Sequence, residues 1–184
     1  MAYWNSRGLR GSTLEEFINL TNEEYLKHGL AVIQKLPTAI KPIQLDPEKR
    51  VIRLAYFEQK STVDYMGNIQ GIPVCFDVKE TGKQSLPISN IHDHQMEFMD
   101  QFSRQNGLAF IIVQFTAVDR CFLLPFEEIK RYWNAAKEGG RKSIPWKAMN
   151  EAYEIKREGL FYLHYLRAVE AYLVDCNPEN ETME

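Results

Sequence analysis

Residues 108–115 constrain the fold more than any other segment, because seven of these eight residues are apolar. A run of this length predicts a β-strand that is covered on both faces. It is too short to cross a membrane, and no apolar run in the chain approaches the roughly 18 residues that a membrane helix needs. The chain is therefore expected to build a sheet around this strand, with helices flanking the sheet.

Periodicity and end signals predict the other elements. Residues 12–28 carry apolar residues at helical spacing, and Gly29 is a candidate C-cap. Ser12 and Thr13 are candidate N-caps, which would put an acidic pair, Glu15 and Glu16, in the first turn. The remaining predicted elements are helices at 91–105, at 125–136 and after Gly159, strands at 30–33, 51–57 and 120–124, and a hairpin over 61–81 with its turn near 67–71. Their order is typical of a compact α/β sheet with flanking helices.

Residues 36–50 are expected to lie outside the core. Pro37, Pro42 and Pro47 recur every five residues, a pattern that excludes a helix and disfavours a central strand. The segment is therefore predicted to form a projecting loop or ribbon.

Length and composition fit one globular domain. The chain has 184 residues, 45% of them hydrophobic, and a domain of this size builds a sizeable core without disulfides. Its cysteines, Cys75, Cys121 and Cys176, have no zinc-binding spacing and are expected to be reduced and packed. The N-terminus lacks the apolar region of a signal peptide, so we expect a cytoplasmic protein that does not contact a membrane. We expect a single domain over residues 1–174 and an acidic, disordered tail over 175–184.

The charge of the chain is unevenly distributed. Its 22 basic and 25 acidic residues give a net charge of −3, which by itself argues against a nucleic-acid binder. However, residues 170–184 contain five acids and no lysine or arginine, whereas residues 130–158 contain eight basic residues and four acids. The total therefore averages a basic face with an acidic end. Modest basicity predicts a nucleic-acid affinity that falls steeply with salt.

The clearest chemical signature lies on the predicted hairpin. Asp77 and Lys79 are two residues apart on one arm, so their side chains point to the same side of a strand. Simple antiparallel register would bring Asp64, on the other arm, close to Asp77. Two converging carboxylates repel each other unless a cation lies between them, and their oxygen atoms suit Mg²⁺ or Mn²⁺. With a lysine beside the metal, the pattern predicts a phosphodiesterase site.

The spacing alone also fits a surface hairpin with solvated charges, or a cross-strand ion pair. The surrounding sequence favours catalysis, because Glu15, Asp64 and the run Asp77-Val78-Lys79 together resemble the PD-(D/E)xK nuclease core, with Val63 at the proline position. More narrowly, the chain resembles the RecU family of Holliday-junction resolvases. The segments that carry this resemblance, between residue 5 and about residue 173, are 5–8, 11–15, 31–35, 60–65, 76–81, 91–95 and 140–144.

This resemblance implies a restriction-endonuclease-like mixed sheet in a homodimer that cuts four-way DNA junctions in recombination and repair. It implies Mg²⁺ as the cofactor, with Mn²⁺ as an alternative, held by Asp64 and Asp77, while Lys79 stabilises the transition state. Thr62 and Gln95 match positions that complete the metal site. Glu15 matches a helix glutamate that reaches the site through water. Asp77 stands where a glutamate is usual, which shortens that ligand by one methylene.

The same resemblance makes residues 36–50 a stalk that projects toward the junction centre. Lys35, Lys41 and Arg53 are expected to contact phosphates there, although a solvated surface ribbon is the simpler alternative. Arg7 and Arg10 are expected to steer or clamp the phosphate near the first helix, the alternative being a flexible charged terminus.

Several functional possibilities stay open at this point. His92 and His94 form a metal-like pair, but residues two apart on a helix point in different directions and are not expected to share an ion. A recombinase or a branch-migration protein is a further candidate partner. The alternative functions are a related nuclease that acts on linear, phage or restriction-type DNA, and a catalytically silent junction-binding module.

Overall fold

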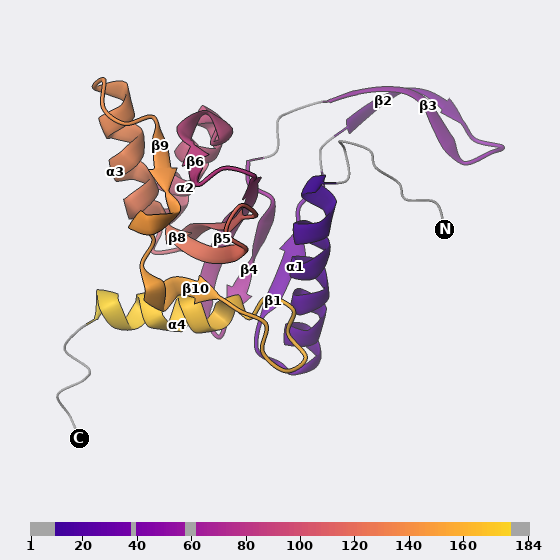
Figure 1. The fold of residues 1–184 in the computed structure, drawn as a ribbon. Coiled ribbons are helices and arrows are strands. Elements are labelled where there is room, and N and C mark those ends of the chain that lie inside the picture. The colour runs from indigo at the N-terminus through magenta and orange to yellow at the C-terminus, as the bar shows by residue number, and fades with distance from the viewer. Residues whose placement is uncertain (1–9, 38–39, 58–61, 178–184) are drawn as a thin grey trace.

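A six-stranded mixed sheet forms the centre of the protein, whose computed structural model describes residues 10–37, 40–57 and 62–177 (Figure 1). All neighbouring strands run antiparallel except the two central ones, β5 and β7, which run parallel. The spatial order of the strands is β1 (Val32–Lys35), β4 (Tyr65–Ile69), β5 (Ile72–Thr81), β7 (Leu108–Phe115), β8 (Arg120–Pro125) and β10 (Glu154–Ile155). The apolar strand expected at 108–115 therefore lies in the middle of the sheet.

Helices cover both faces of this sheet, which confirms the predicted α/β class, a mixed sheet with flanking helices. Alternation along β7 divides the core in two: Phe110 and Ile112 point toward one helix pair, and Ile111 and Val113 toward the other, each with no exposed surface. The first face is covered by α1 (Arg10–Lys27) and α4 (Tyr165–Cys176), and the second by α2 (Asp93–Ser103) and α3 (Phe126–Lys137).

Several short elements connect this frame and were not expected from the sequence. Two three-residue strands, β6 (Ser85–Pro87) and β9 (Ser143–Pro145), pair antiparallel beside α3. Three single turns of 3₁₀ helix are present: η1 (Ile88–Asn90) follows β6, η2 (Trp146–Ala148) follows β9, and η3 (Glu151–Tyr153) precedes β10.

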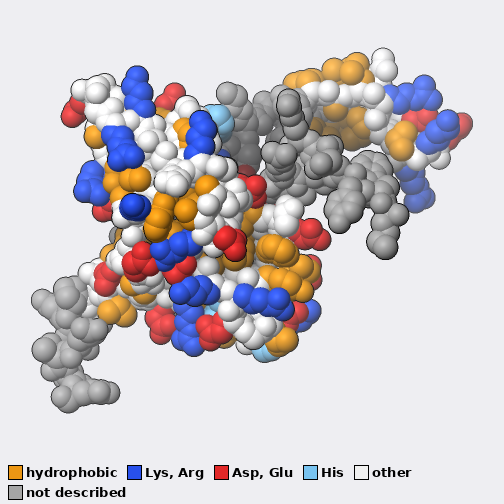
Figure 2. All heavy atoms as spheres, in the orientation of Figure 1, with side chains coloured by type: hydrophobic (Ala, Val, Ile, Leu, Met, Phe, Trp, Pro, Cys, Tyr) orange, Lys and Arg blue, Asp and Glu red, His pale blue; other side chains and the backbone are white. Residues whose placement is uncertain are grey.

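The predicted projecting segment is a two-stranded ribbon formed by β2 (Ile40–Asp46) and β3 (Val51–Phe57), which pair only with each other and extend away from the sheet (Figure 1). The projection is confirmed, but the ribbon continues to residue 57 instead of ending near 50. The strand expected at 51–57 thus lies outside the core. Orange hydrophobic side chains lie at the surface of the ribbon in Figure 2. Between 46% and 63% of the side chain is exposed at Ile40, Ile43, Leu45, Val51, Ile52, Leu54 and Tyr56.

The ends of the first and last helices differ from the predictions. Helix α1 begins at Arg10, so Ser12 and Thr13 lie inside the helix instead of capping it, and its first turn contains no acid. Gly29 does follow the helix in a left-handed conformation, with a φ of 66°. Helix α4 begins at Tyr165 and not directly after Gly159, because the intervening chain forms a loop closed by the His164 N–H, which donates to the Lys156 carbonyl.

Helix α4 continues to Cys176, two residues into the predicted tail, and residues 178–184 of that tail lie outside the described residues. Cys75 and Cys121 are buried free thiols as expected, whereas Cys176 is exposed, so the prediction that all three are packed is wrong. Burial raises the pKa of Cys75 to about 12. No helix in the described ranges is both long and apolar enough to cross a membrane.

Gly67 lies within β4, although its sequence suggests a turn. The hairpin instead turns at Gln70 and Gly71, both with positive φ. Gly67 pairs with Ile33 of β1, and a Cβ atom at Gly67 would lie 2.0 Å from the Val32 carbonyl oxygen. The absence of a side chain is thus what lets β1 approach β4.

We expect Gly67→Ala to destabilise the fold by about 2 kcal/mol or more, because β1 must move away from β4 to admit the methyl group. Gly82→Ala is the matched control, since a Cβ atom there meets only Thr116 Oγ1 at an ordinary 3.8 Å. Urea unfolding of both variants measures the difference. Equal stability of the two variants would contradict this account of Gly67.

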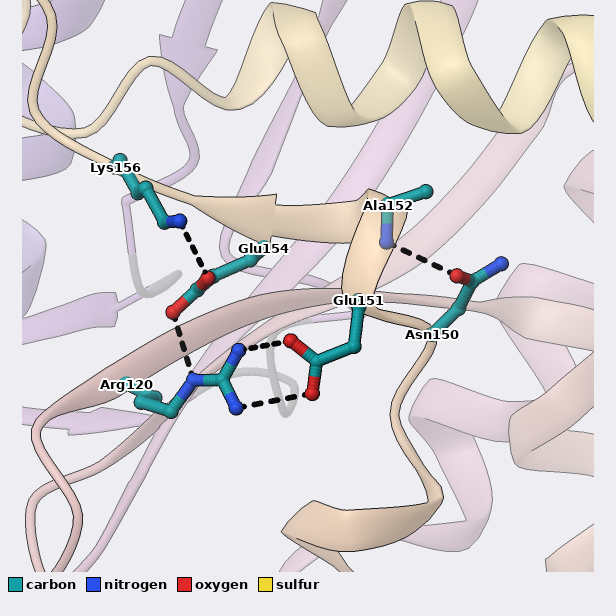
Figure 3. A network of polar contacts seen from close by, with 6 residues as sticks. All are labelled: Arg120, Asn150, Glu151, Ala152, Glu154 and Lys156. Atoms are coloured by element: carbon teal, nitrogen blue, oxygen red, sulfur yellow. Dashed lines mark hydrogen bonds and ion pairs between the residues drawn. The ribbon is translucent and has the colours of Figure 1, made fainter.

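Arg120 on β8 ties the last edge strand to the sheet (Figure 3). Its Nε donates to Glu154 Oε1 at 2.7 Å, and its two terminal nitrogens bind both oxygens of Glu151. Lys156 Nζ lies 2.8 Å from Glu154 Oε2. The hydrogen bond from Arg120 is the main reason that the pKa of Glu154 falls from its ordinary 4.5 to about 2.

A carboxyl group whose pKa is lower in the folded chain stabilises the fold above its unfolded pKa, and that contribution is lost as the pH falls toward the folded value. We therefore expect Glu154→Gln to cost about 1 kcal/mol at neutral pH. The difference from the wild type should shrink between pH 4.5 and pH 2. Chemical unfolding across this range measures it, and a difference that stayed constant with pH would assign the loss to packing instead of charge.

Candidate active site

The register of the β4–β5 hairpin brings the two predicted carboxylates together. Tyr65 pairs with Phe76, which places Asp64 opposite Asp77. The Asp64 N–H donates to Asp77 Oδ1 at 2.9 Å, and the Val78 N–H donates to Asp64 Oδ2 at 3.0 Å. Each carboxylate is thus held by the backbone of the opposite arm, and the predicted convergence is confirmed.

The second oxygen of Asp77 is placed to bind a cation. Asp77 has no exposed surface, and Lys79 Nζ lies 2.7 Å from Asp77 Oδ2. This contact is an ion pair without hydrogen-bond geometry, because Oδ2 accepts no hydrogen bond from the described part of the chain. A buried carboxylate oxygen left in this state costs free energy unless a positive charge compensates it.

The electrostatics of Asp64 also indicate an excess of negative charge. Burial, together with the charge of Asp77, raises the pKa of Asp64 to about 6, against the opposing effects of the Val78 N–H and Lys79. Independently of this shift, two ionised carboxylates and a single ammonium leave an excess of negative charge. Two hard oxygen ligands with uncompensated charge fit a divalent cation such as Mg²⁺.

The other predicted metal ligands are less clearly placed. Thr62 is partly exposed and lies two residues before Asp64. Gln95 is buried at the start of α2, where its Oε1 accepts a hydrogen bond from the His92 N–H at 3.1 Å and keeps one lone pair for another partner. The described residues contain no cluster of three His, Cys, Asp or Glu side chains that could hold a metal, so oxygen atoms of other kinds would have to complete the site.

Glu15 lies on α1, which is bonded to β4, but its carboxylate contacts a lysine instead of the predicted metal site. Tyr65 of β4 donates to Asn19 Oδ1 of α1 at 2.9 Å, which holds this helix beside the hairpin. The Glu15 carboxylate itself lies 2.5 Å from Lys35 Nζ. Glu15 is not among the groups that shift the pKa of Asp64, so its contact with the site through water stays a prediction. Nothing in the sequence spacing indicated the pair with Lys35.

The predicted DNA-contact residues differ in their exposure and in their ion-pair partners. Lys41 is exposed on β2 of the ribbon, whereas Arg53 on β3 forms an ion pair with Asp46 at 2.6 Å. Arg10 is the first residue of α1, and Arg7 lies outside the described residues. Of the two predicted contact residues on the ribbon, Lys41 is therefore the clearer example of an exposed cation.

The two histidines differ from the expectation in their geometry. His92 lies just before α2 and not within it, so helical spacing does not separate it from His94. Their rings stack, with centroids 5.4 Å apart and planes 13° from parallel. Within the described ranges, neither belongs to a cluster of three metal-ligating groups.

A surface recess elsewhere on the molecule does not contain these residues. It has a volume of about 730 Å³, and its lining includes Ile69, His164 and Leu173. Neither Asp64 nor Asp77 contributes to it. We assign the candidate active site from the carboxylate chemistry and not from the depth of a cavity.

Comparison with known proteins gives close relatives. The sequence model of the family described as Recombination protein U matches residues 9–171. Holliday junction resolvase RecU of Geobacillus sp. (strain WCH70) is 43% identical over 163 residues, which cover 86% of this chain and 76% of the relative. The protein of the same name from Pediococcus pentosaceus is 39% identical over 168 residues, with 89% and 84% covered.

Two solved structures are similar at a lower level. The Holliday junction resolvase Hjc of Archaeoglobus fulgidus is 12% identical with a TM-score of 0.39, and covers 64% of this chain and 74% of its own. A bacterial homing endonuclease is 15% identical with a TM-score of 0.40, and covers 96% and 98%. Both scores are too low to support an argument. The family match over residues 9–171 and the identity to the two relatives decide the assignment: the chain belongs to the RecU, or Recombination protein U, family.

Proposed function

We propose that this protein is a structure-selective endonuclease that resolves Holliday junctions by metal-dependent phosphodiester hydrolysis, in DNA recombination and repair. The observation that carries this proposal is the set of Asp64, Asp77 and Lys79, in which a buried oxygen of Asp77 lies against the lysine ammonium and accepts no hydrogen bond from the described residues. The junction as substrate is supported by the names of the relatives.

Each residue of this set has a distinct role in the proposal. Asp64 and Asp77 hold Mg²⁺, or alternatively Mn²⁺, through the oxygens that face each other across the hairpin. The bound metal would activate water for attack on the phosphodiester and neutralise the charge that develops. Lys79, with 17% of its side chain exposed, points its ammonium toward the same space and stabilises negative charge on the phosphate. Thr62, Gln95 and Glu15 are proposed to complete the site.

The protein is proposed to act as a homodimer in the cytoplasm, because a junction has two strands of like polarity to cut. Paired sites make the two cuts nearly simultaneous. The ribbon offers apolar side chains that are exposed in one copy, including Ile43 at 58% and Leu45 at 63%, and a second copy would cover them. A recombinase or a branch-migration protein stays a candidate partner.

We expect Asp64→Asn to reduce junction cleavage in Mg²⁺ by about a thousandfold or more, because the variant loses a charged ligand. It keeps an oxygen that can accept from the Val78 N–H, so junction binding should change little. Cleavage and gel-shift assays on a synthetic four-way junction measure the two effects. Asp100→Asn is the control, since that carboxylate pairs with Lys130 and Arg104 instead.

The outcomes separate the alternatives. Normal cutting by Asp64→Asn would overturn the site assignment. No nicking by the wild type at any Mg²⁺ or Mn²⁺ concentration would indicate a silent binding module. Equal affinity for junction and linear duplex would favour a different DNA substrate.

The ribbon makes a separate prediction about assembly. We expect the double variant Ile43→Ser and Leu45→Ser to weaken the dimer at least tenfold, because it removes apolar surface that the dimer would bury. Analytical ultracentrifugation over a range of protein concentrations measures the dissociation constant. A matched double variant at Leu26 and Leu160, which are similarly exposed on the other part of the molecule, should leave it unchanged. A wild-type protein that stays monomeric at all concentrations would refute the homodimer.

A further inference from the structure

Lysine and arginine side chains gather on α3 and on the segment that follows it, away from the ribbon (Figure 2). Between residues 130 and 147 there are six basic residues and a single acid. We call the exposed members around the end of this helix the α3 patch. It consists of Lys137, Arg141, Lys142 and Lys147, together with Trp133.

The cations of the α3 patch differ from their neighbours in having no acidic partner. Lys130 pairs with Asp100 at 2.7 Å, and Arg131 pairs with Glu128 at 2.5 Å. Within residues 10–37, 40–57 and 62–177, no carboxylate forms an ion pair with any cation of the patch. The patch therefore presents uncompensated positive charge to an anionic ligand.

The surface between these side chains is hollowed. A recess of about 240 Å³ lies between the end of α3 and η1, lined by apolar groups of Ile88, Trp133 and Ala136 and by two lysines, Lys137 and Lys142. Lys137 Nζ lies 5.2 Å from the centre of the Trp133 ring. An apolar wall with two ammonium groups at its rim matches the sugar–phosphate backbone of a nucleic acid, in which sugars alternate with anions.

Backbone contacts fix the patch relative to the active site. The Ile88 N–H donates to the Lys142 carbonyl at 3.0 Å, and the Trp146 N–H donates to the Gln84 carbonyl at 3.1 Å. These bonds join the basic loop to the chain that leaves β5, the strand that carries Asp77. The loop turns sharply at Gly140, whose N–H donates to the Ala135 carbonyl at 2.8 Å.

The patch also lies on the same side of the sheet as the catalytic carboxylate. Cys75 packs in the core beneath α2 and α3. Asp77 is two residues further along β5, so its side chain points to that face as well. A DNA chain that reaches Asp77 from this side would pass near α3.

We propose that the α3 patch binds the sugar–phosphate backbone of a duplex arm of the DNA substrate, outside the junction centre that the ribbon addresses. This inference rests on the proposed function, since it takes DNA to be the substrate. Helix α3, with 12 residues, is about 18 Å long, roughly half a turn of B-form DNA. The contact is with phosphates and sugars, so it is independent of sequence.

The test removes three charges of the patch in the variant Lys137→Ala, Arg141→Ala, Lys142→Ala. The control removes three exposed charges near α1 and α4, in the variant Lys27→Ala, Arg157→Ala, Arg167→Ala. Each protein is titrated with a fluorescent four-way junction and with a linear duplex of about 30 base pairs, in EDTA to prevent cutting, over a range of salt concentrations. Thermal unfolding confirms that both variants fold.

We expect the patch variant to bind both DNAs about tenfold more weakly than the control variant at low salt. The slope of log affinity against log salt should fall by about 0.9 for each phosphate contact that is lost. The single variant Lys142→Glu should weaken binding more than Lys142→Ala, because it adds repulsion to the lost contact.

The inference is overturned if the patch variant binds both DNAs like the control, or if it changes only the oligomeric state, which would assign the patch to protein contact. The two proposals fail separately. If the wild type cuts junctions while the patch variant binds normally, the surface assignment is wrong and the proposed function stands. If patch-dependent duplex binding is found in a protein that cuts no junction, the proposed function is wrong and the DNA surface stands.

Discussion

The pairing of β4 with β5 is the constraint on which the active site depends. A slip of one residue would turn every side chain of a strand to the opposite face, so Asp77 would enter the core under α1 and α4. Stacked rings oppose this slip. Tyr65, Phe76 and Phe110 lie on three adjacent strands, with successive centroids 4.8 Å apart and planes within 9° of parallel. The stacked rings on the face under α1 and α4 thus fix the register that turns Asp77 to the other face.

This arrangement explains how the fold tolerates two carboxylates at its centre. Asp77 is fully buried and one of its oxygens accepts no hydrogen bond from the described chain, a state that costs stability. The cost is offset by the largely buried apolar strand β7 beside it and by the ammonium of Lys79. A hydrogen bond to this oxygen of Asp77 would stabilise the fold, but it would also compete with a metal for the same oxygen. The unsatisfied oxygen is therefore expected at a functional position and is hard to explain at a structural one.

The sequence predicted the parts of the structure that depend on local pattern. The central strand, the hairpin and the meeting of Asp64 with Asp77 follow from apolar runs and from the period of two in a strand. The wrong predictions concern residues whose structure depends on contacts between segments far apart in the sequence. The sequence around Gly67 is typical of a turn, but the residue lies within β4 and packs against β1. The pairing of β6 with β9 joins segments nearly 60 residues apart. The ion pair of Glu15 with Lys35 likewise joins a helix to the edge of the sheet, which no spacing rule indicates.

The net charge of −3 is compatible with the proposed DNA binding because of where the compensated charges lie. Nine of the nineteen acids described outside the ribbon form ion pairs, as Glu154 and Glu151 do with Arg120, so these nine contribute little field beyond their own contact. Cations that form no ion pair within the described residues are found both on the ribbon, at Lys41, and at the end of α3. Charge at two separated places binds a branched ligand in one orientation more effectively than the same charge gathered at one site, because both contacts must form together. If the proposed function is right, a chain of nearly balanced composition can therefore select a branched DNA by position where it lacks the total charge to bind all DNA tightly.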